Sequence, residues 1–407
     1  MNKAAITYIS ITYLIFIFGP WPYPFVALDL LTLFVTLIFL TFLLNALLFK
    51  ELKYELSKEN FNDKYSEYII FGGCICLLLG IIEYFRAYPE IVPLILEGDL
   101  GGAYLYLVTS EDPYLEVPLF MFASVLFSPF LYISLGMIFF YDYFSPKIQK
   151  LLILFGIVYI LRFLLFGQLK GVVDVGGVFS LYLLRKGNFS LLRLIFRPQV
   201  IFLSSFFGLL AFTIHLSREY GLEYGTFGEP LFIQTERPYF QDDSILESFY
   251  VFFELVSRYF GHGYYALSQS FIIDFKPDII SSSLFVNDNF EDLYMDSNYS
   301  LIKILGDDFG WDYKKLWHTQ FLWWISGFGF AGAILIIFFQ QFFYLSLISR
   351  ASSKNSNYFE LGIIGILSIN FIYMPLNNQI FYNFEGVFSL FILTVLAISK
   401  KLLKPKL

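Results

Sequence analysis

Long apolar segments recur along this chain and constrain its fold more than any other feature. Apolar runs of about 18 to 25 residues are typical of helices that cross a lipid bilayer. Hydrophobic residues make up 57% of the 407 residues and charged residues only 15%, whereas soluble domains contain about 25% charged residues. The sequence therefore predicts an all-α, polytopic integral membrane protein.

We expect about ten transmembrane helices, seven before a long polar segment and three after it. They cover residues 4–19, 26–49, 68–85, 117–140, 151–166, 172–184, 200–216, 319–345, 359–374 and 387–398. The chain then divides into an N-terminal membrane bundle, one large and partly helical loop, and a C-terminal membrane bundle. These three parts comprise residues 1–216, 217–317 and 318–407.

Lysine and arginine are concentrated in alternate loops, which predicts how the chain is oriented in the membrane. The basic loops are residues 50–67, 141–150, 185–197 and 346–357, together with the C-terminal tail. Because basic loops face the cytoplasm, we expect both termini to be cytoplasmic. The chain is then a multi-pass protein of a bacterial inner membrane, and its large loop is periplasmic.

The negative charge of the large loop indicates which classes of partner it can bind. Residues 218–317 contain seven basic and seventeen acidic residues, a formal charge of −10 in a chain whose net charge is −7. Nucleic acid is bound mainly by neutralising its phosphates with Lys and Arg, so a nucleic-acid partner is excluded. Acidic and aromatic side chains suit carbohydrate instead.

One short segment of the loop has the residues for group transfer. Residues 242–270 are predicted to be helical, with Gly261 and Gly263 breaking the helical pattern. Arg258 and His262 share one face if the helix persists. Arginine suits phosphate, and histidine takes a proton near neutral pH, so this pair suits glycosyl transfer from a lipid pyrophosphate. In the alternative interpretation Arg258 pairs with Glu254, and His262 caps a helix.

Other ionisable residues lie in or beside apolar spans, where charges are costly and often functional. Arg162, Lys170 and Asp174 either line a cavity under the large loop, or the last two form an i,i+4 ion pair. Arg86 and Arg218 are either pyrophosphate contacts or anchors that snorkel to the membrane interface.

Signals for a metal or another cofactor are missing, so a metal-independent reaction without a cofactor is favoured. The first external turn has no acidic pair, and Cys74 and Cys76 lie in an apolar run where helix packing explains them. In the last external turn, Asn377, Asn378 and Glu385 either touch substrate or form a hydrated turn.

The segment RYFGHGYYAL at residues 258–267 resembles the central loop segment of the Wzy-type O-antigen and oligosaccharide repeat-unit polymerases. The spacing from His262 to Ser270, eight positions, also matches a His–Ser spacing of some members. About ten spans, cytoplasmic termini and a large external loop late in the chain are similar too. The Arg-to-Gly spacings of eleven or sixteen positions found in some members do not occur in this loop.

The resemblance implies a GT-C-type helical fold and a polymerase activity. A growing glycan on undecaprenyl pyrophosphate is transferred to a new lipid-linked repeat unit on the periplasmic face. The implied partners are undecaprenyl-pyrophosphate-linked oligosaccharides, membrane lipids, a chain-length regulator and a flippase.

The resemblance and the position of charge together give a set of candidate site residues. The candidate catalytic residues are His262, as base or acceptor-orienting group, and Arg258, as a pyrophosphate contact. The candidate substrate-binding residues are Arg237, Arg218, Arg162, Lys170, Arg86, Tyr264, Tyr265 and Ser270.

Three other functions stay open. An O-antigen ligase, which transfers finished glycan to lipid A-core, shares this architecture and also relies on external arginines and a histidine. A lipid-linked oligosaccharide flippase or other transporter is expected to have more spans, shorter loops and charges deep within several helices. A membrane scaffold is the least attractive alternative, because Arg162, Lys170 and Asp174 lie where charges are costly.

Overall fold

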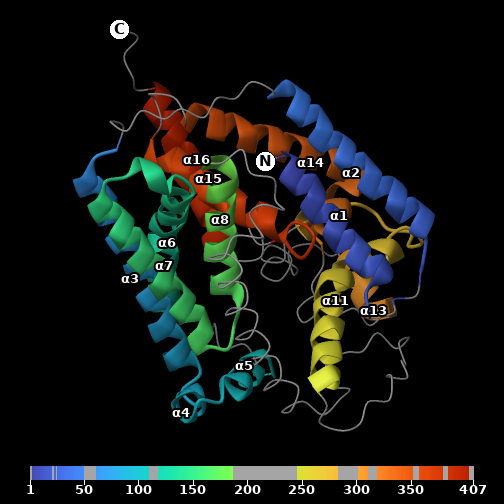
Figure 1. The fold of residues 1–407 in the computed structure, drawn as a ribbon, viewed down its shortest axis with the longest axis horizontal. Helices are drawn as coiled ribbons and strands as arrows, with labels where there is room; N and C mark the ends of the chain where they lie inside the picture. Colours follow the sequence, from blue (N-terminus) through green and yellow to red (C-terminus); the bar gives the residue numbers. More distant parts are fainter. Residues whose placement is uncertain are drawn as a thin grey trace. The chain divides into compact units, whose positions relative to one another are not determined.

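The computed structural model describes residues 2–20, 23, 25–49, 61–109, 118–186, 245–282, 301–309, 319–351, 357–378 and 384–402. Every regular element in these ranges is helical, which confirms the all-α prediction (Figure 1). The helices are α1 (Asn2–Phe18), α2 (Leu28–Leu48), α3 (Asp63–Ala87), α4 (Ile91–Glu97), α5 (Leu100–Thr109), α6 (Pro118–Phe139), η2 (Tyr141–Tyr143), α7 (Pro146–Leu165), α8 (Lys170–Lys186), α11 (Ile245–Gln269), η3 (Ile279–Ser282), α13 (Leu301–Phe309), α14 (Gln320–Ala351), α15 (Tyr358–Tyr373) and α16 (Phe384–Leu402).

Five helices of the described ranges are long and apolar enough to cross a membrane. They are Leu28–Leu48, Asp63–Ala87, Phe120–Phe139, Pro146–Leu165 and Gln320–Ala351. Ala5–Phe18 and Tyr358–Tyr373 are apolar but shorter. These helices support a membrane protein, while the total of about ten spans stays a prediction. The predicted span at residues 200–216 lies outside the described residues.

The chain packs into two compact units, each built from segments that are distant in the sequence. Unit 1 comprises Met1–Lys50, Tyr224–Phe343 and Tyr373–Tyr382, and unit 2 comprises Glu51–Glu223, Tyr344–Ile372 and Asn383–Leu407. Each unit therefore combines parts of both predicted membrane bundles. The division along the chain at residues 216 and 317 stays a prediction.

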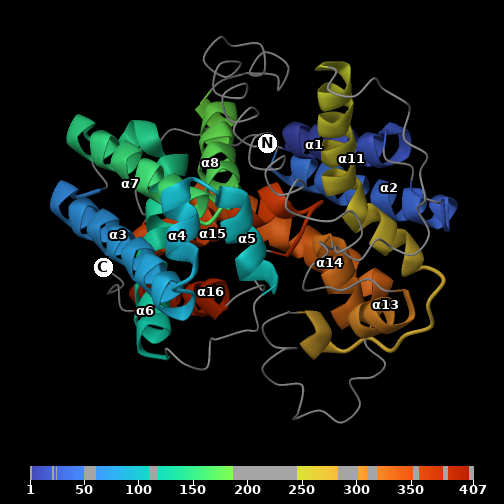
Figure 2. The same ribbon diagram turned by 90° about the horizontal axis from the view of Figure 1, so that it is seen from below.

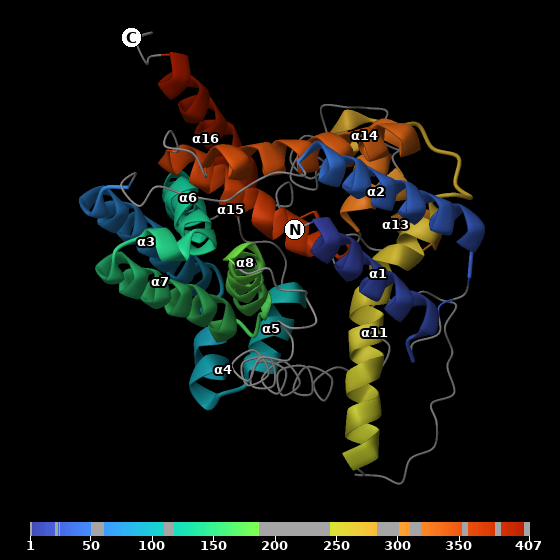
Figure 3. The same cartoon turned by 45° about the horizontal axis from the view of Figure 1, so that its top comes forward.

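Unit 2 is a helical bundle in which α3 packs against α6 and α7 (Figures 1 and 3). In the same unit, α8 contacts α6 and α7, and α16 contacts α6. Gly136 of α6 lies directly against the backbone carbonyl of Leu361, and Gly365 lies against that of Tyr132. Small residues let two membrane helices approach closely, so these glycines bring α6 and α15 into backbone contact.

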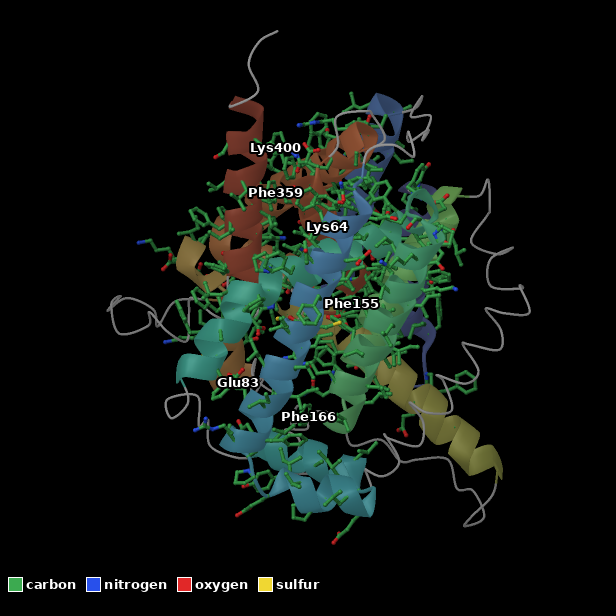
Figure 4. The ribbon with its side chains drawn as sticks, turned by 90° about the vertical axis from the view of Figure 1, so that its left-hand side faces the viewer. Lys64, Glu83, Phe155, Phe166, Phe359 and Lys400 are labelled. Carbon is green, nitrogen blue, oxygen red and sulfur yellow. The ribbon has the colours of Figure 1, made fainter. Side chains whose placement is uncertain are left out.

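Three ion pairs lie at one end of unit 2, which we call the basic end. Lys147 pairs with Glu67 at 2.6 Å, Arg350 with Glu360 at 2.9 Å and Arg185 with Asp142 at 2.6 Å. Figure 4 shows Lys64 and Lys400 at this end and Glu83 near the opposite one, the Glu83 end. The predicted basic loops therefore begin or end at one end of unit 2. Which side of a membrane this end faces stays a prediction.

Two short helices lie near the Glu83 end, between the spans that the sequence predicts at residues 68–85 and 117–140. Helices α4 and α5 contact each other beyond α3 (Figure 2). A buried apolar cluster of Tyr88, Ile91, Ala103 and Phe166 joins them to α7. The apolar side chains of this segment therefore pack at the end of the bundle.

In unit 1, α14 is interrupted, although the sequence predicts one continuous span over residues 319–345. Gly329 has φ 70° and ψ 175°, a conformation that glycine reaches at little cost because it has no Cβ. The chain turns back at this residue, so that Gln320 Nε2 donates to Gln340 Oε1 at 3.1 Å. A break that depends on one glycine's φ leaves the apolar pattern unchanged, which is why the pattern did not reveal it.

Candidate functional site

The segment at residues 257–270 lies on α11, which runs unbroken from Ile245 to Gln269. The expectation that Gly261 and Gly263 break the helix is therefore wrong. A Cβ at Gly261 would collide with the ring of Tyr23, and one at Gly263 would lie 2.8 Å from the backbone nitrogen of Thr319. Both glycines are thus points of close packing within a helix.

Aromatic packing and a hydrogen bond join this part of α11 to α1 and to Tyr23. The Tyr264 hydroxyl shares a hydrogen bond of 3.0 Å with Thr12 of α1, and its ring lies 5.5 Å from that of Tyr13. Burial raises the pKa of Tyr264, so it stays a neutral hydrogen-bonding group. The ring of Tyr265 stacks on Tyr23 at 5.4 Å.

Ser270 completes this packing just after the helix. Its hydroxyl donates to the Leu267 carbonyl at 2.6 Å, and the side chain is fully buried. Tyr264 and Tyr265 are buried as well. These three predicted substrate contacts therefore have packing roles in the structure, and their contact with substrate stays a prediction.

His262 differs from its neighbours because it is partly exposed. Every other residue from Gly261 to Ser270 is buried, and the imidazole meets the ring of Tyr23 edge-on, with the ring centroids 6.0 Å apart. The helix continues for seven residues beyond His262, so the alternative that His262 caps a helix is wrong.

Arg258 lies one turn before His262 on α11, so the helical backbone places both positions on one face. The side chain of Arg258 lies outside the described structure. The alternative pairing of Arg258 with Glu254 therefore stays open. Arg218 and Arg237 also fall outside the described residues.

Unit 2 holds a buried arginine near its Glu83 end. Arg162, in the last turn of α7, is 9% exposed, and its guanidinium carbon lies 5.2 Å from the centroid of the Phe163 ring. The guanidinium also lies against Gly80 of α3, where a Cβ would collide with it. Its buried Nε has no hydrogen-bond partner within the described ranges. Glycine at position 80 therefore makes room for this cation.

Two carboxylates lie near enough to Arg162 to influence it electrostatically, but they do not pair with it. Glu83 of α3 and Glu385, in the first turn of α16, both interact electrostatically with the guanidinium. Within the described part of the chain, neither carboxylate lies within the 4.0 Å of an ion pair with Arg162. Ser124 of α6 donates to Glu385 Oε1 at 2.8 Å. We call Arg162, Glu83 and Glu385 the charged triad.

Glu83 is the member of the triad that the sequence analysis missed. It lies inside the apolar span predicted at residues 68–85, and a carboxylate in such a span is a signal of function. The structure places Glu385 in the triad rather than in an isolated hydrated turn. Asn377 and Asn378, which share its predicted turn, are buried at 4% and 2% exposure.

The ion-pair interpretation of Lys170 and Asp174 is confirmed. Lys170 Nζ lies 2.9 Å from Asp174 Oδ2, which also accepts from the Tyr159 hydroxyl at 2.7 Å. Asp174 is fully buried. Lys170 is therefore largely neutralised by its partner, which weakens its candidacy as a pyrophosphate contact.

The remaining residues singled out in the sequence are one exposed arginine and two cysteines that form no disulfide. Arg86 is exposed, and its guanidinium carbon lies 4.9 Å from the centroid of the Phe120 ring. Cys74 and Cys76 are free thiols. Among the described residues, no group of three or more His, Cys, Asp or Glu could hold a metal ion.

Comparison with known proteins gives no relative for this chain. A scan against protein-family models, a search of curated proteins and a search of solved structures each found no match.

Proposed function

We propose that this chain is a membrane glycosyltransferase that polymerises lipid-linked oligosaccharide repeat units. It transfers the growing glycan from undecaprenyl pyrophosphate to a new repeat unit at the periplasmic face of a bacterial inner membrane. The observation that supports this proposal most is the exposure of His262. It is the one residue from Gly261 to Ser270 that is not buried, and it lies in the segment that resembles the Wzy-type polymerases.

The reaction needs a base and a cationic site, and α11 has a candidate for each. The acceptor hydroxyl oxygen forms a bond to the anomeric carbon, and the bond from that carbon to the pyrophosphate oxygen breaks. His262 takes the hydroxyl proton, a role that suits imidazole near neutral pH. Arg258, together with Arg218 or Arg237, stabilises the charge on the departing undecaprenyl pyrophosphate. No metal ion is needed for this chemistry.

The packing around His262 supports this role because it fixes the helix backbone. Gly261 and Gly263 let neighbouring groups approach α11 closely, and Tyr264 is hydrogen-bonded to Thr12. A group that transfers a proton acts best when its position is fixed before the substrate binds. The segment thus combines a rigid backbone with one accessible imidazole.

The experiment is a polysaccharide ladder on a gel from a deletion strain complemented with wild type, His262→Ala or Arg258→Ala. Phe253→Ala, at an exposed position of the same helix, is the matched control. A single repeat in the deletion strain, with a ladder restored by wild type and the control only, supports both activity and site. Core without any repeat points to a ligase, and an unchanged ladder in the deletion strain contradicts the proposal.

A transporter of lipid-linked oligosaccharides is the second candidate, and a specific observation favours it. Arg162 and Asp174 are buried among the helices of unit 2, and buried charges in membrane bundles often line transport paths. Loss of a transporter leaves the repeat units on the cytoplasmic leaflet. Loss of a polymerase leaves single units exposed to the periplasm, where an externally added glycosidase reaches them in spheroplasts.

A further inference from the structure

We propose that the charged triad, Arg162, Glu83 and Glu385, binds a neutral, polyhydroxylated group, namely a sugar of the repeat unit. The inference rests on the proposed function only in naming the source of that sugar. It assigns Arg162 a role different from the pyrophosphate contact that the sequence analysis expects. It also adds two carboxylates to the site.

The three charged groups of the triad lie near one another but form no ion pair. A guanidinium has only hydrogen-bond donors, and an ionised carboxylate has only acceptors. Arg162 is 9% exposed and forms no hydrogen bond to any described residue, and it forms no ion pair with Glu83 or Glu385. Burying such groups without partners is costly. Hydroxyl groups both donate and accept, so a sugar satisfies the guanidinium and the carboxylates together.

The net charge of the triad favours a neutral ligand over an anion. The triad combines one positive with two negative groups, so its formal charge is −1 when both carboxylates are ionised. A pyrophosphate placed beside Arg162 would be repelled by each of these carboxylates that is ionised, and this repulsion is strong where the dielectric constant is low. A neutral sugar avoids that repulsion. The triad therefore fits the glycan part of a lipid-linked substrate better than its pyrophosphate.

Neighbouring residues of unit 2 hold the side chains of the triad in place. Gly80 makes room for the guanidinium, and Ser124, which is itself fully buried, fixes one oxygen of Glu385 at 2.8 Å. Glu83 and Glu385 are only half-buried, and they lie in the last turns of α3 and the first turn of α16.

The test measures binding to the purified full-length protein in detergent, by saturation-transfer NMR titration with two probes. One probe is the oligosaccharide released by mild acid from the lipid-linked repeat unit of the deletion strain, and the other is inorganic pyrophosphate. The variants are Arg162→Gln and Glu385→Gln. Lys147→Gln, which removes an exposed charge at the basic end of unit 2, is the control.

We expect both triad variants to weaken oligosaccharide binding by about tenfold or more, since hydrogen bonds to charged groups are lost. Pyrophosphate binding should be unchanged in them, and both affinities should be unchanged in the control. The isosteric Glu385→Gln keeps the hydrogen bond with Ser124 in range, so it decides the question if Arg162→Gln does not fold.

Three results would overturn the proposal: a wild-type protein that binds no oligosaccharide, triad variants with unchanged oligosaccharide affinity, or triad variants that lose pyrophosphate binding alone. The proposed function fails in a different way. If wild type binds the oligosaccharide through the triad but polymerises nothing, the sugar site stands and the polymerase does not. If wild type polymerises and Glu385→Gln binds normally, only the sugar site is refuted.

Discussion

The α11 segment of unit 1 and the charged triad of unit 2 hold their polar residues in opposite ways. Around His262, the buried hydroxyl of Tyr264 has a protein partner and the imidazole of His262 is partly exposed. In the triad, the guanidinium of Arg162 is buried and has no hydrogen-bond partner among the described residues, while the carboxylates remain half-buried.

This difference separates the changes that should affect function alone from those that should also affect stability. Removing an exposed group from a well-packed helix costs little stability. Removing one member of a buried set of charges leaves the others uncompensated and costs more. We therefore expect changes on the exposed side of α11 to affect the reaction alone, and changes to buried charges of unit 2 to affect folding as well.

The largest effect is expected for the Lys170–Asp174 pair of unit 2. Lys170→Met leaves the fully buried Asp174 carboxylate without its cation and should lower the free energy of unfolding by about 3 kcal/mol. The double variant Lys170→Met/Asp174→Asn removes both charges and keeps an oxygen that can accept from the Tyr159 hydroxyl, so it should recover most of this loss. Thermal unfolding in detergent measures both, and a double variant no more stable than the single one would refute the ion-pair account.

A smaller loss is expected where α11 packs most closely in unit 1. In Gly263→Ala the new Cβ lies 2.8 Å from a backbone nitrogen, that of Thr319, and the backbone must shift at a cost of about 2 kcal/mol. Gly176→Ala on α8, where nothing lies within 4 Å of the new Cβ, is the control and should not lower the unfolding temperature. Equal unfolding temperatures for the two variants would contradict the close packing of α11.

The hydrogen bond between α1 and α11 should contribute less. Thr12→Val removes the closer of two hydrogen-bond partners of the Tyr264 hydroxyl, which also donates to the Ile9 carbonyl at 3.5 Å, and should cost about 1 kcal/mol. Thr36→Val, which removes an exposed hydroxyl bonded only to the Thr32 carbonyl of its own helix, is the control. A cost that is the same in both variants would show that the contact between the helices contributes nothing.

Gly80→Ala should affect binding but hardly stability. The new Cβ displaces the end of the flexible Arg162 side chain, while alanine gains roughly 0.5–1 kcal/mol in helix propensity. The unfolding temperature should therefore change little. Affinity for the released oligosaccharide should fall as it does in Arg162→Gln, and full affinity in Gly80→Ala would place the sugar elsewhere.

The helices could largely be predicted from the sequence, because apolar run length is a local property. The helix predicted at residues 242–270 is described as Ile245–Gln269, and the span at residues 151–166 lies within α7 apart from its last residue. The sequence does not show which glycines interrupt a helix. Gly261 and Gly263 continue a helix whereas Gly329 interrupts one, and the difference depends on tertiary neighbours and on φ.

The candidate sites could be predicted only in part. Arg162 and the Lys170–Asp174 pair were found because a charge in an apolar span is conspicuous and an i,i+4 spacing is local. The sequence does not predict the triad, because Glu83 and Glu385 come near Arg162 only through the packing of α3 on α6 and α7 and of α16 on α6. No residue spacing in the sequence indicates that these three side chains lie near one another.

The most direct measurement is chain elongation by the purified protein, with the lipid-linked repeat unit as the only substrate. Wild type and His262→Ala are compared after their unfolding temperatures have been shown to agree. We predict that wild type extends the glycan and releases undecaprenyl pyrophosphate, while His262→Ala is slower by about 100-fold or more, the contribution of a general base. No elongation by wild type, or an unchanged rate in His262→Ala, would contradict the account.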